Sequence, residues 1–199
     1  MFKSEAVLKL QEATVARWHI EPVDNLYDGL LGIVCKQHAF NYNLWHQEDI
    51  ARSRDVTDSE IAQVKRNIDT LNQNRNDWIE KIDDWISETL SQQGELEKCT
   101  APMNTETPGS VIDRLSIIAL RIYHLQEQLE RNDVGQEHLD SVQQKIAICL
   151  LQRSELAQSL DELICDLLAG RKRHRTYRQF KMYNDPALNP YLYQQKTVA

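Results

Sequence analysis

The sequence predicts an all-α protein, and three features of its composition and pattern support this. Only 6 glycines and 5 prolines occur in 199 residues, too few for the many turns of a β-sandwich or barrel. Apolar residues recur every three or four positions over long stretches, which is the spacing of one helix face. The apolar and charged fractions, 41% and 27%, are typical of a globular protein. We therefore expect a single antiparallel bundle of about five helices over residues 1–170, followed by a basic, aromatic segment over residues 171–199 that packs on it.

Two helices are expected in the first quarter of the chain. Ser4 is a good N-cap for a helix that runs to about Trp18, and Pro22 marks the break after it. A second helix is expected over residues 25–54, where an apolar stripe repeats by three and four positions.

The longest helix is expected to begin at a capping box. Thr57 followed by Glu60 has the T-x-x-E spacing of that motif, and the helical pattern continues over residues 58–93. Gly94 is suited to the position just after the helix, and the proline-containing residues 95–109 are expected to form an exposed loop.

Two further helices complete the predicted bundle. Leucines and isoleucines form a stripe over residues 110–131, and a second stripe covers residues 136–169 before Gly170. The two longest helices, over residues 58–93 and 136–169, are expected to pair as a coiled-coil-like hairpin.

Composition also limits the cellular setting. The chain has no run of about 18 apolar residues, so no transmembrane span is expected. Glu5 and Glu12 interrupt any apolar signal-peptide segment, and the 4 cysteines lack the CxxC spacing of common metal sites. These features predict a cytoplasmic protein with reduced thiols.

The charge is distributed unevenly along the chain. The net charge is −7, but residues 171–181 hold six basic residues and no acid, which leaves 17 basic against 30 acidic residues elsewhere. An acidic body with a short basic tail argues against nucleic acid as the main partner. Because the tail also carries tyrosines and a phenylalanine, RNA, phosphate or an anionic membrane surface remain alternatives to packing on the acidic bundle.

The densest polar stretches are residues 38–53 and 65–83. Helical spacing places His38, Trp45 and Asp49 on one face of the second helix, and His46 lies three residues before Asp49. The third helix carries a polar face at the same spacing, formed by Asp69, Asn72, Gln73, Asn76, Glu80 and Asp83. If the two helices are neighbours, these faces form a pocket of carboxylates, imidazoles and amides, although a solvated charged face and structural histidines explain the same pattern.

Arginine occupies a position of the apolar stripe in two helices, at Arg75 and Arg153. A buried guanidinium is costly unless it is paired. Each arginine therefore either pairs with a carboxylate or projects into a cavity that binds an anion. The candidate carboxylates are Glu48, Asp49 and Asp113.

Three stretches resemble a bacterial family known as domain of unknown function 4254: LWHQEDIAR at 44–52, KRNIDTLNQNRNDWIEKID at 65–83 and FKMYNDPALNP at 180–190. The resemblance implies a bacterial, cytoplasmic, helical protein of about this size, expected near genes for cell-surface glycans and glycosyltransferases. It brings no established activity. Its motifs highlight Trp45, His46, Glu48, Asp49, Arg52, Lys65, Arg66, Asp69, Asn72, Gln73, Arg75, Asn76 and Asp77.

Two functions remain open from the sequence. The first is an enzyme or ligand-binding protein for a nucleotide, nucleotide-sugar or sugar phosphate, with His46, Glu48, Asp49 and Asp69 as catalytic candidates. Its phosphate ligands are expected among Arg52, Lys65, Arg66, Asn72, Gln73, Arg75, Asn76 and Asp77, and a Mg²⁺ or Mn²⁺ ion has His46, Asp49, Glu80 and Asp83 as candidate ligands. Helical nucleotide pyrophosphohydrolases use paired ExxE and ExxD motifs, of which only Glu80 and Asp83 match here. The second is a non-catalytic helical adaptor that binds a protein partner such as a glycan-assembly enzyme, and long helical seams also suit a homodimer.

Overall fold

The computed structural model describes residues 2–92 and 100–194, and its elements are helical, as predicted. Within these residues, the one β-type contact is an isolated bridge between Met103 and Arg173. The helices are α1 (Ser4–Trp18), α2 (Gly29–Arg52), α3 (Asp58–Gln92), α4 (Pro108–Leu129), α5 (Gln136–Leu168), the 3-10 helix η1 (Met182–Asn184) and α6 (Pro190–Tyr193).

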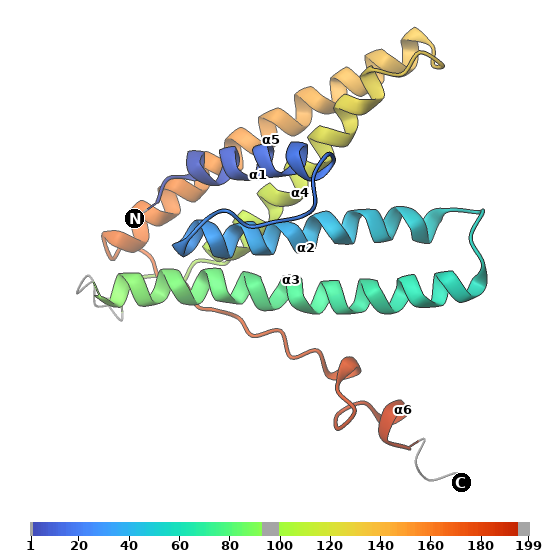
Figure 1. The fold of residues 1–199 in the computed structure, drawn as a ribbon. Coiled ribbons are helices and arrows are strands. Elements are labelled where there is room, and N and C mark those ends of the chain that lie inside the picture. Colours follow the sequence, from blue (N-terminus) through green and yellow to red (C-terminus); the bar gives the residue numbers. More distant parts are fainter. Residues whose placement is uncertain (1, 93–99, 195–199) are drawn as a thin grey trace.

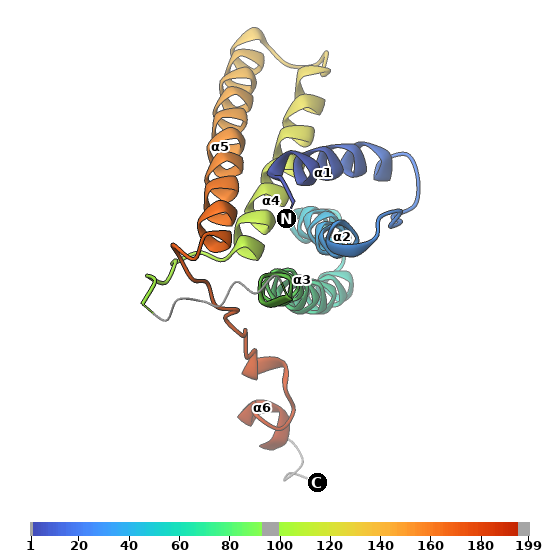
Figure 2. The same cartoon turned by 90° about the vertical axis from the view of Figure 1, so that its left-hand side faces the viewer.

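The long helices form two antiparallel hairpins that cross each other. In Figure 1, α2 lies along α3 and α4 lies along α5; Figure 2 shows the first pair nearly end-on while the second runs upright. Helix α1 packs against α2, α4 and α5, and so joins the hairpins. The expected pairing of the two longest helices, α3 and α5, is therefore replaced by pairing between chain neighbours, which short connections favour.

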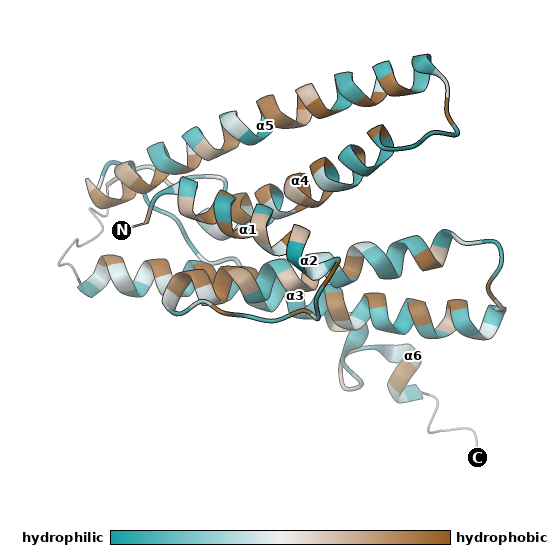
Figure 3. Ribbon diagram, turned by 45° about the horizontal axis from the view of Figure 1, so that its top comes forward, coloured by the Kyte–Doolittle hydropathy of each residue, from teal (hydrophilic) through white to brown (hydrophobic). Residues whose placement is uncertain are grey.

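The main core lies where the two hairpins and α1 meet. Ile82 and Ile86 of α3, Leu115 and Leu120 of α4 and Leu160 of α5 are fully buried there. Figure 3 shows the apolar positions of α4 and α5 alternating with polar ones along each helix, as expected for helices that bury one face. This core fixes the crossing of α4 over α2, on which the candidate site depends.

Local signals placed several helix ends correctly. The Thr57 hydroxyl accepts from the Glu60 N–H at 3.3 Å, and the Glu60 carboxylate accepts from the Thr57 N–H at 2.8 Å, which confirms the capping box. Helix α5 begins at Gln136 as predicted, and Gly170 follows it with a φ of +61°. Gly94 and residues 95–99 lie outside the described residues.

Three other helix starts differ from the prediction. Lys3, not Ser4, is the N-cap of α1, because the Ser4 hydroxyl and N–H donate to Asp161 of α5 at 3.0 and 2.8 Å. Helix α2 begins at Gly29 instead of about residue 25. Pro108 and Gly109, expected in a loop, form the first turn of α4. A proline is tolerated there because the N–H groups of a first turn have no partner within the helix.

The C-terminal arm, residues 171–194, leaves the end of α5, passes α3 and extends beyond it (Figure 1). Arg178 pairs with Glu80 at 3.0 Å and with Asp84 at 2.9 Å, and the Gln179 N–H donates to Glu80 at 2.7 Å. The arm thus meets acidic residues of α3. No helix among the described residues is both long and apolar enough to cross a membrane.

Candidate functional site

The structure distributes the predicted polar patch over several places. Asn67 of α3 donates to Gln47 of α2 at 2.9 Å, so these two helices are neighbours, as the patch required. His46, however, packs against the rings of His19 and His124, which belong to the region of α1 and to α4. The imidazole predicted to face α3 therefore lies between α1, α2 and α4.

Many of the other predicted residues pair within their own helix. Glu48, Asp69 and Asp77 each accept from a residue four positions away, and such surface pairs add only a few tenths of a kcal/mol. The pairs are Arg52 with Glu48 at 2.7 Å, Lys65 with Asp69, and Gln73 with Asp77 at 2.8 Å. Asp49 and Arg66 are exposed, and Asn72 and Asn76 are half-buried. The charged pairs of this α3 face are thus formed within the helix, and Gln73 also lines a cavity with Gln179, Phe180 and Lys181 of the arm.

The predicted metal ligands of α3, Glu80 and Asp83, lie further along the helix, near the C-terminal arm and the start of α4. Glu80 is held by the arm, and Asp83 is buried and accepts the Gly109 N–H at 2.7 Å at the start of α4. Burial raises the pKa of the Asp83 carboxyl to about 6. Glu80 is 13 residues beyond Asn67, or about 20 Å along a helix. Glu80 and Asp83 therefore do not join His46 and Asp49 in one centre.

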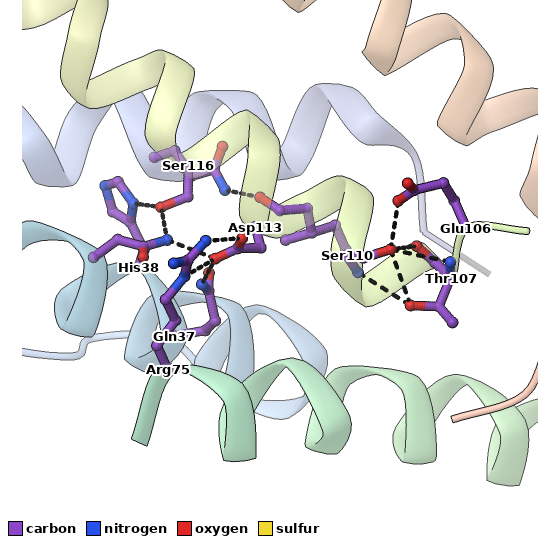
Figure 4. A network of polar contacts seen from close by, with 11 residues as sticks. Gln37, His38, Arg75, Glu106, Thr107, Ser110, Asp113 and Ser116 are labelled. Carbon is purple, nitrogen blue, oxygen red and sulfur yellow. Dashed lines mark hydrogen bonds and ion pairs between the residues drawn. The ribbon is translucent and has the colours of Figure 1, made fainter. Parts of the chain in front are cut away.

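Arg75 pairs with Asp113, one of the three carboxylates considered from the sequence. The Arg75 Nε and Nη2 atoms donate to the two oxygens of Asp113 at 2.8 and 2.5 Å, a bidentate pair (Figure 4). Gln37 and Asn41 of α2 donate to the same carboxylate at 2.6 and 3.0 Å. The carboxylate therefore ties α2, α3 and α4 together.

Next to this carboxylate, His38 and Ser116 extend the polar contacts. The His38 Nδ1 lies 2.6 Å from the Ser116 hydroxyl, which also accepts from Asn41 at 2.8 Å (Figure 4). Burial lowers the pKa of His38 to about 3, so its ring is neutral near pH 7. We call this group the Asp113 network; it comprises Gln37, His38, Asn41, Arg75, Asp113 and Ser116.

The second arginine of the apolar stripes is paired differently. The Arg153 Nη1 lies 3.7 Å from the Glu12 carboxylate of α1, and 23% of the Arg153 side chain is exposed. This geometry is that of a long side chain that extends to the edge of the contact between α1 and α5 and keeps part of its surface in water.

A cavity of about 420 Å³ opens beside the Asp113 network, between α4, α5 and Arg75 of α3. We call it the arginine cavity. Its charged and polar lining residues are Arg75, Asp113, Arg114, Arg121, Gln152, Glu155 and Ser159, with Ile117, Ile118 and Leu156 as its apolar wall. Three arginines against two carboxylates give the lining an excess positive charge.

Sequence reasoning found one of the three arginines. Arg75 was recognised because it interrupts an apolar stripe, whereas Arg114 and Arg121 of the fourth helix were not singled out. Their spacing of seven positions, which puts them on the same face of α4 beside Asp113, was the available signal.

His19, His46 and His124 form a histidine cluster between the end of α1, α2 and α4. Their metal-binding nitrogens lie within 4.8 Å of one another. The Nε2 atom of each ring is buried and has no hydrogen-bond partner. Burial, and then the neighbouring His19 and His124, lower the pKa of His46. Sequence reasoning named only His46, because His19 and His124 are distant in the chain and share no motif spacing with it.

The fold and site together define an all-α protein whose α4 contributes to two polar centres, the arginine cavity and the histidine cluster. The chain belongs to the family described as protein of unknown function (DUF4254), which matches residues 31–176. His46, His124 and the three cavity arginines lie within the matched segment, and His19 precedes it. No curated protein and no solved structure is significantly similar to the chain.

Proposed function

We propose that this protein binds a small phosphorylated ligand, with an anionic group of the ligand in the arginine cavity. The observation that carries the proposal is the convergence of Arg75, Arg114 and Arg121 on one cavity. A nucleotide, nucleotide-sugar or sugar phosphate is the class of ligand considered, and a link to cell-surface glycan metabolism rests on the family resemblance alone. Whether the ligand is also transformed is a separate question.

The chemistry of the cavity suits a phosphate group. A guanidinium presents donors in a planar fork that matches two phosphate oxygens. Asp113 occupies the Nε and Nη2 edge of Arg75 and thereby orients it, so that the remaining N–H groups, on Nη1 and Nη2, are the ones a ligand would meet. An arginine held in this way loses less conformational entropy when it binds.

The size and wall of the cavity fit a sugar phosphate or nucleotide. Its volume of about 420 Å³ lies within the usual range for ligand pockets of about 300–1,000 Å³. Ile117 and Leu156 supply apolar wall, while Gln152 and Ser159 supply hydroxyl and amide groups of the kind that bind sugar hydroxyls. The α3 face is a weaker candidate, because Asp69 and Asp77 already accept hydrogen bonds from residues of the same helix and Arg66 is not among the arginines that line the arginine cavity.

The test is isothermal titration of the full chain with UDP-glucose, glucose 1-phosphate and pyrophosphate. We expect at least one probe to bind, and Arg121→Gln to weaken that binding by about tenfold or more, the size of one charged hydrogen bond. Arg66→Gln is the matched control, since Arg66 is an exposed arginine of the α3 face. A loss of binding in Arg66→Gln alone would place the site on α3, and no binding by any probe would contradict the proposal.

A second candidate function is the adaptor, and the C-terminal arm favours it. Phe180 and Tyr191 are 84% and 82% exposed, which is unusual for large apolar side chains that lie close together in sequence. An arm of this kind is suited to dock on a protein partner. The test is the double variant Phe180→Ser with Tyr191→Ser. The adaptor function predicts that this variant still binds the phosphate ligand but no longer captures a specific protein from the native cell.

A further inference from the structure

We infer that His19, His46 and His124 bind one divalent transition-metal ion through their Nε2 atoms, with Zn²⁺ as the ion this donor set suits best. The inference does not depend on the proposed phosphate ligand, because metal binding is measured on the protein alone.

The spacing of the three rings matches that of a three-histidine metal centre. Their centroids are separated by 5.3 Å (His19 to His46), 5.1 Å (His19 to His124) and 5.6 Å (His46 to His124). With Zn–N bonds of about 2.0–2.1 Å and tetrahedral angles, ring centroids in such a centre lie about 5.2 Å apart. The backbone thus already places the rings at the required separation, and small side-chain rotations bring the nitrogens to the ion.

In two of the three rings the Nδ1 atom, which we call the outer nitrogen, is held by a hydrogen bond. The His19 Nδ1 lies 2.7 Å from the Val15 carbonyl oxygen, and the His124 Nδ1 lies 2.7 Å from a carboxylate oxygen of Glu127. Since both partners are acceptors, each Nδ1 carries the proton and each Nε2 carries a lone pair. Carbonyl and carboxylate partners on the outer nitrogen are the usual supports of metal-binding histidines.

The inner nitrogens are left without partners inside the protein. The Nε2 atoms of His19, His46 and His124 are each buried and accept no hydrogen bond. Unpaired buried polar atoms are destabilising. A cation bound among the three rings would give each Nε2 atom a partner. Aromatic packing explains why the rings touch, but it does not supply a partner for these three nitrogens.

Aromatic side chains hold the rings in position. Tyr123 stacks on His19 with centroids 4.1 Å apart, Trp45 stacks on His124 at 4.9 Å, and Tyr42 meets His46 edge-on at 4.5 Å. Ligands fixed by packing and by outer hydrogen bonds give a preorganised site.

The donor set selects the class of ion. Imidazole nitrogens favour zinc, copper, nickel or iron, whereas Mg²⁺ prefers oxygen ligands. The cluster therefore favours a different ion from the Mg²⁺ or Mn²⁺ expected from the sequence, whose candidate ligands were His46, Asp49, Glu80 and Asp83. Three histidines leave the fourth tetrahedral position open to water or to another ligand, as in catalytic zinc sites.

The experiment is a titration of the full chain, first freed of metal by dialysis against a chelator. Zn²⁺ binding is followed by calorimetry, and Co²⁺ binding by the visible absorption of a tetrahedral Co²⁺ site. We expect one ion per chain, and loss of the Co²⁺ absorption in His19→Ala, His46→Ala and His124→Ala. His138→Ala is the matched control, because His138 is an exposed histidine of α5; it should bind as the parent chain does.

A variant outside the rings keeps the test decisive if an alanine variant does not fold. Glu127 is 45% exposed at its side chain, so Glu127→Gln should leave the fold intact. It should nevertheless weaken Zn²⁺ binding by about 10–100-fold, because the carboxylate orients His124. Zn²⁺ affinity weaker than about 100 μM in the folded parent chain, or affinity unchanged in Glu127→Gln and in all folded histidine variants, would overturn the inference.

Discussion

The Asp113 network and the histidine cluster, which both include residues of α4, differ in whether a buried charge has its counter-charge within the chain. Around Asp113, the carboxylate receives the Arg75 guanidinium and amide groups from two residues of α2. Around His124, the Nε2 atoms of His19, His46 and His124 have no hydrogen-bond partner in the described structure. The Asp113 network also contains buried atoms without a partner, Gln37 Oε1, His38 Nε2 and Asn41 Oδ1, but its charged carboxylate has a counter-charge within the chain, and the histidine cluster contains no such pairing among its three rings.

This difference predicts a structural role for the Asp113 network, in addition to its orienting of Arg75 at the arginine cavity. A buried charge that is compensated within the fold holds helices together, and its removal leaves its partner uncompensated. Buried acceptors without partners weaken the fold, and such groups are expected at functional sites, where another component offsets the loss.

The largest effect should follow from breaking the compensated centre. Asp113→Leu leaves Arg75, whose side chain is only 27% exposed, without its carboxylate and should destabilise the fold by about 3–5 kcal/mol. For a chain of this length, that lowers Tm by about 6–20 °C in thermal unfolding. The double variant Arg75→Leu with Asp113→Leu should recover much of the loss. A loss below about 1 kcal/mol in the single variant would show that the network does not hold α3 on α4.

A smaller effect should follow from disturbing the contact between Gly109 at the start of α4 and residues Ile79 and Asp83 of α3. We call this contact the α3–α4 joint. A Cβ atom on Gly109 would lie 2.6 Å from the Ile79 carbonyl oxygen and 2.8 Å from an Asp83 oxygen. Gly109→Ala should therefore destabilise the protein by about 1–3 kcal/mol in chemical unfolding. Gly135→Ala is the control, because a Cβ atom there meets nothing within 4 Å. Equal effects of the two substitutions would mean that α3 and α4 separate easily at this joint.

The smallest effect concerns the pH dependence of the Asp113 network. The folded pKa of His38, about 3, lies below its ordinary value of 6.5, so its stabilising contribution is complete above pH 6.5 and is lost as the pH falls. His38 should account for about 1 kcal/mol of stability lost between pH 6.5 and 5.5. His38→Gln should remove this part of the slope in urea unfolding at several pH values.

The comparison with His38→Gln is needed because other groups also change the pH dependence of stability in this range. His46, with its lowered pKa, acts in the same direction as His38. Asp83 acts oppositely: its folded pKa of about 6 exceeds 3.8, so its contribution is greatest at low pH and declines as the pH rises toward 6. An identical slope in the parent and in His38→Gln would assign the pH dependence to these other groups.

Local sequence signals predicted the helices better than their packing. The three- and four-residue periods identified α2, α3, α4 and α5, whereas α1 was predicted from Ser4 and Pro22, and the Thr57 capping box located the start of α3. Ser4 was misassigned because a distant residue, Asp161, uses its hydroxyl. The start of α2 was misplaced because Asn25 bonds to the Gly32 carbonyl at 2.9 Å and holds residues before Gly29 out of the helix.

The candidate site was predicted only in part, for the same reason. Arg75 and its partner Asp113 were within reach of the sequence, because an arginine in an apolar stripe calls for a carboxylate or an anion, and Asp113 was one of the three carboxylates considered. His46 was identified, but its neighbours were expected from α3 and come from α1 and α4. Helical spacing describes one helix at a time and contains no information about which helix faces it.

By itself, the sequence determined the all-α class, the extent of most helices, and the identity of Arg75 and His46 as unusual residues. These properties follow from periodicity and from bonds between residues close in the chain. Only the tertiary structure decided that α2 pairs with α3 and α4 with α5, and that His19, His46 and His124 meet. The physical reason is that the crossing of the two hairpins is set by side-chain packing between segments far apart in the chain, and the site forms where they cross.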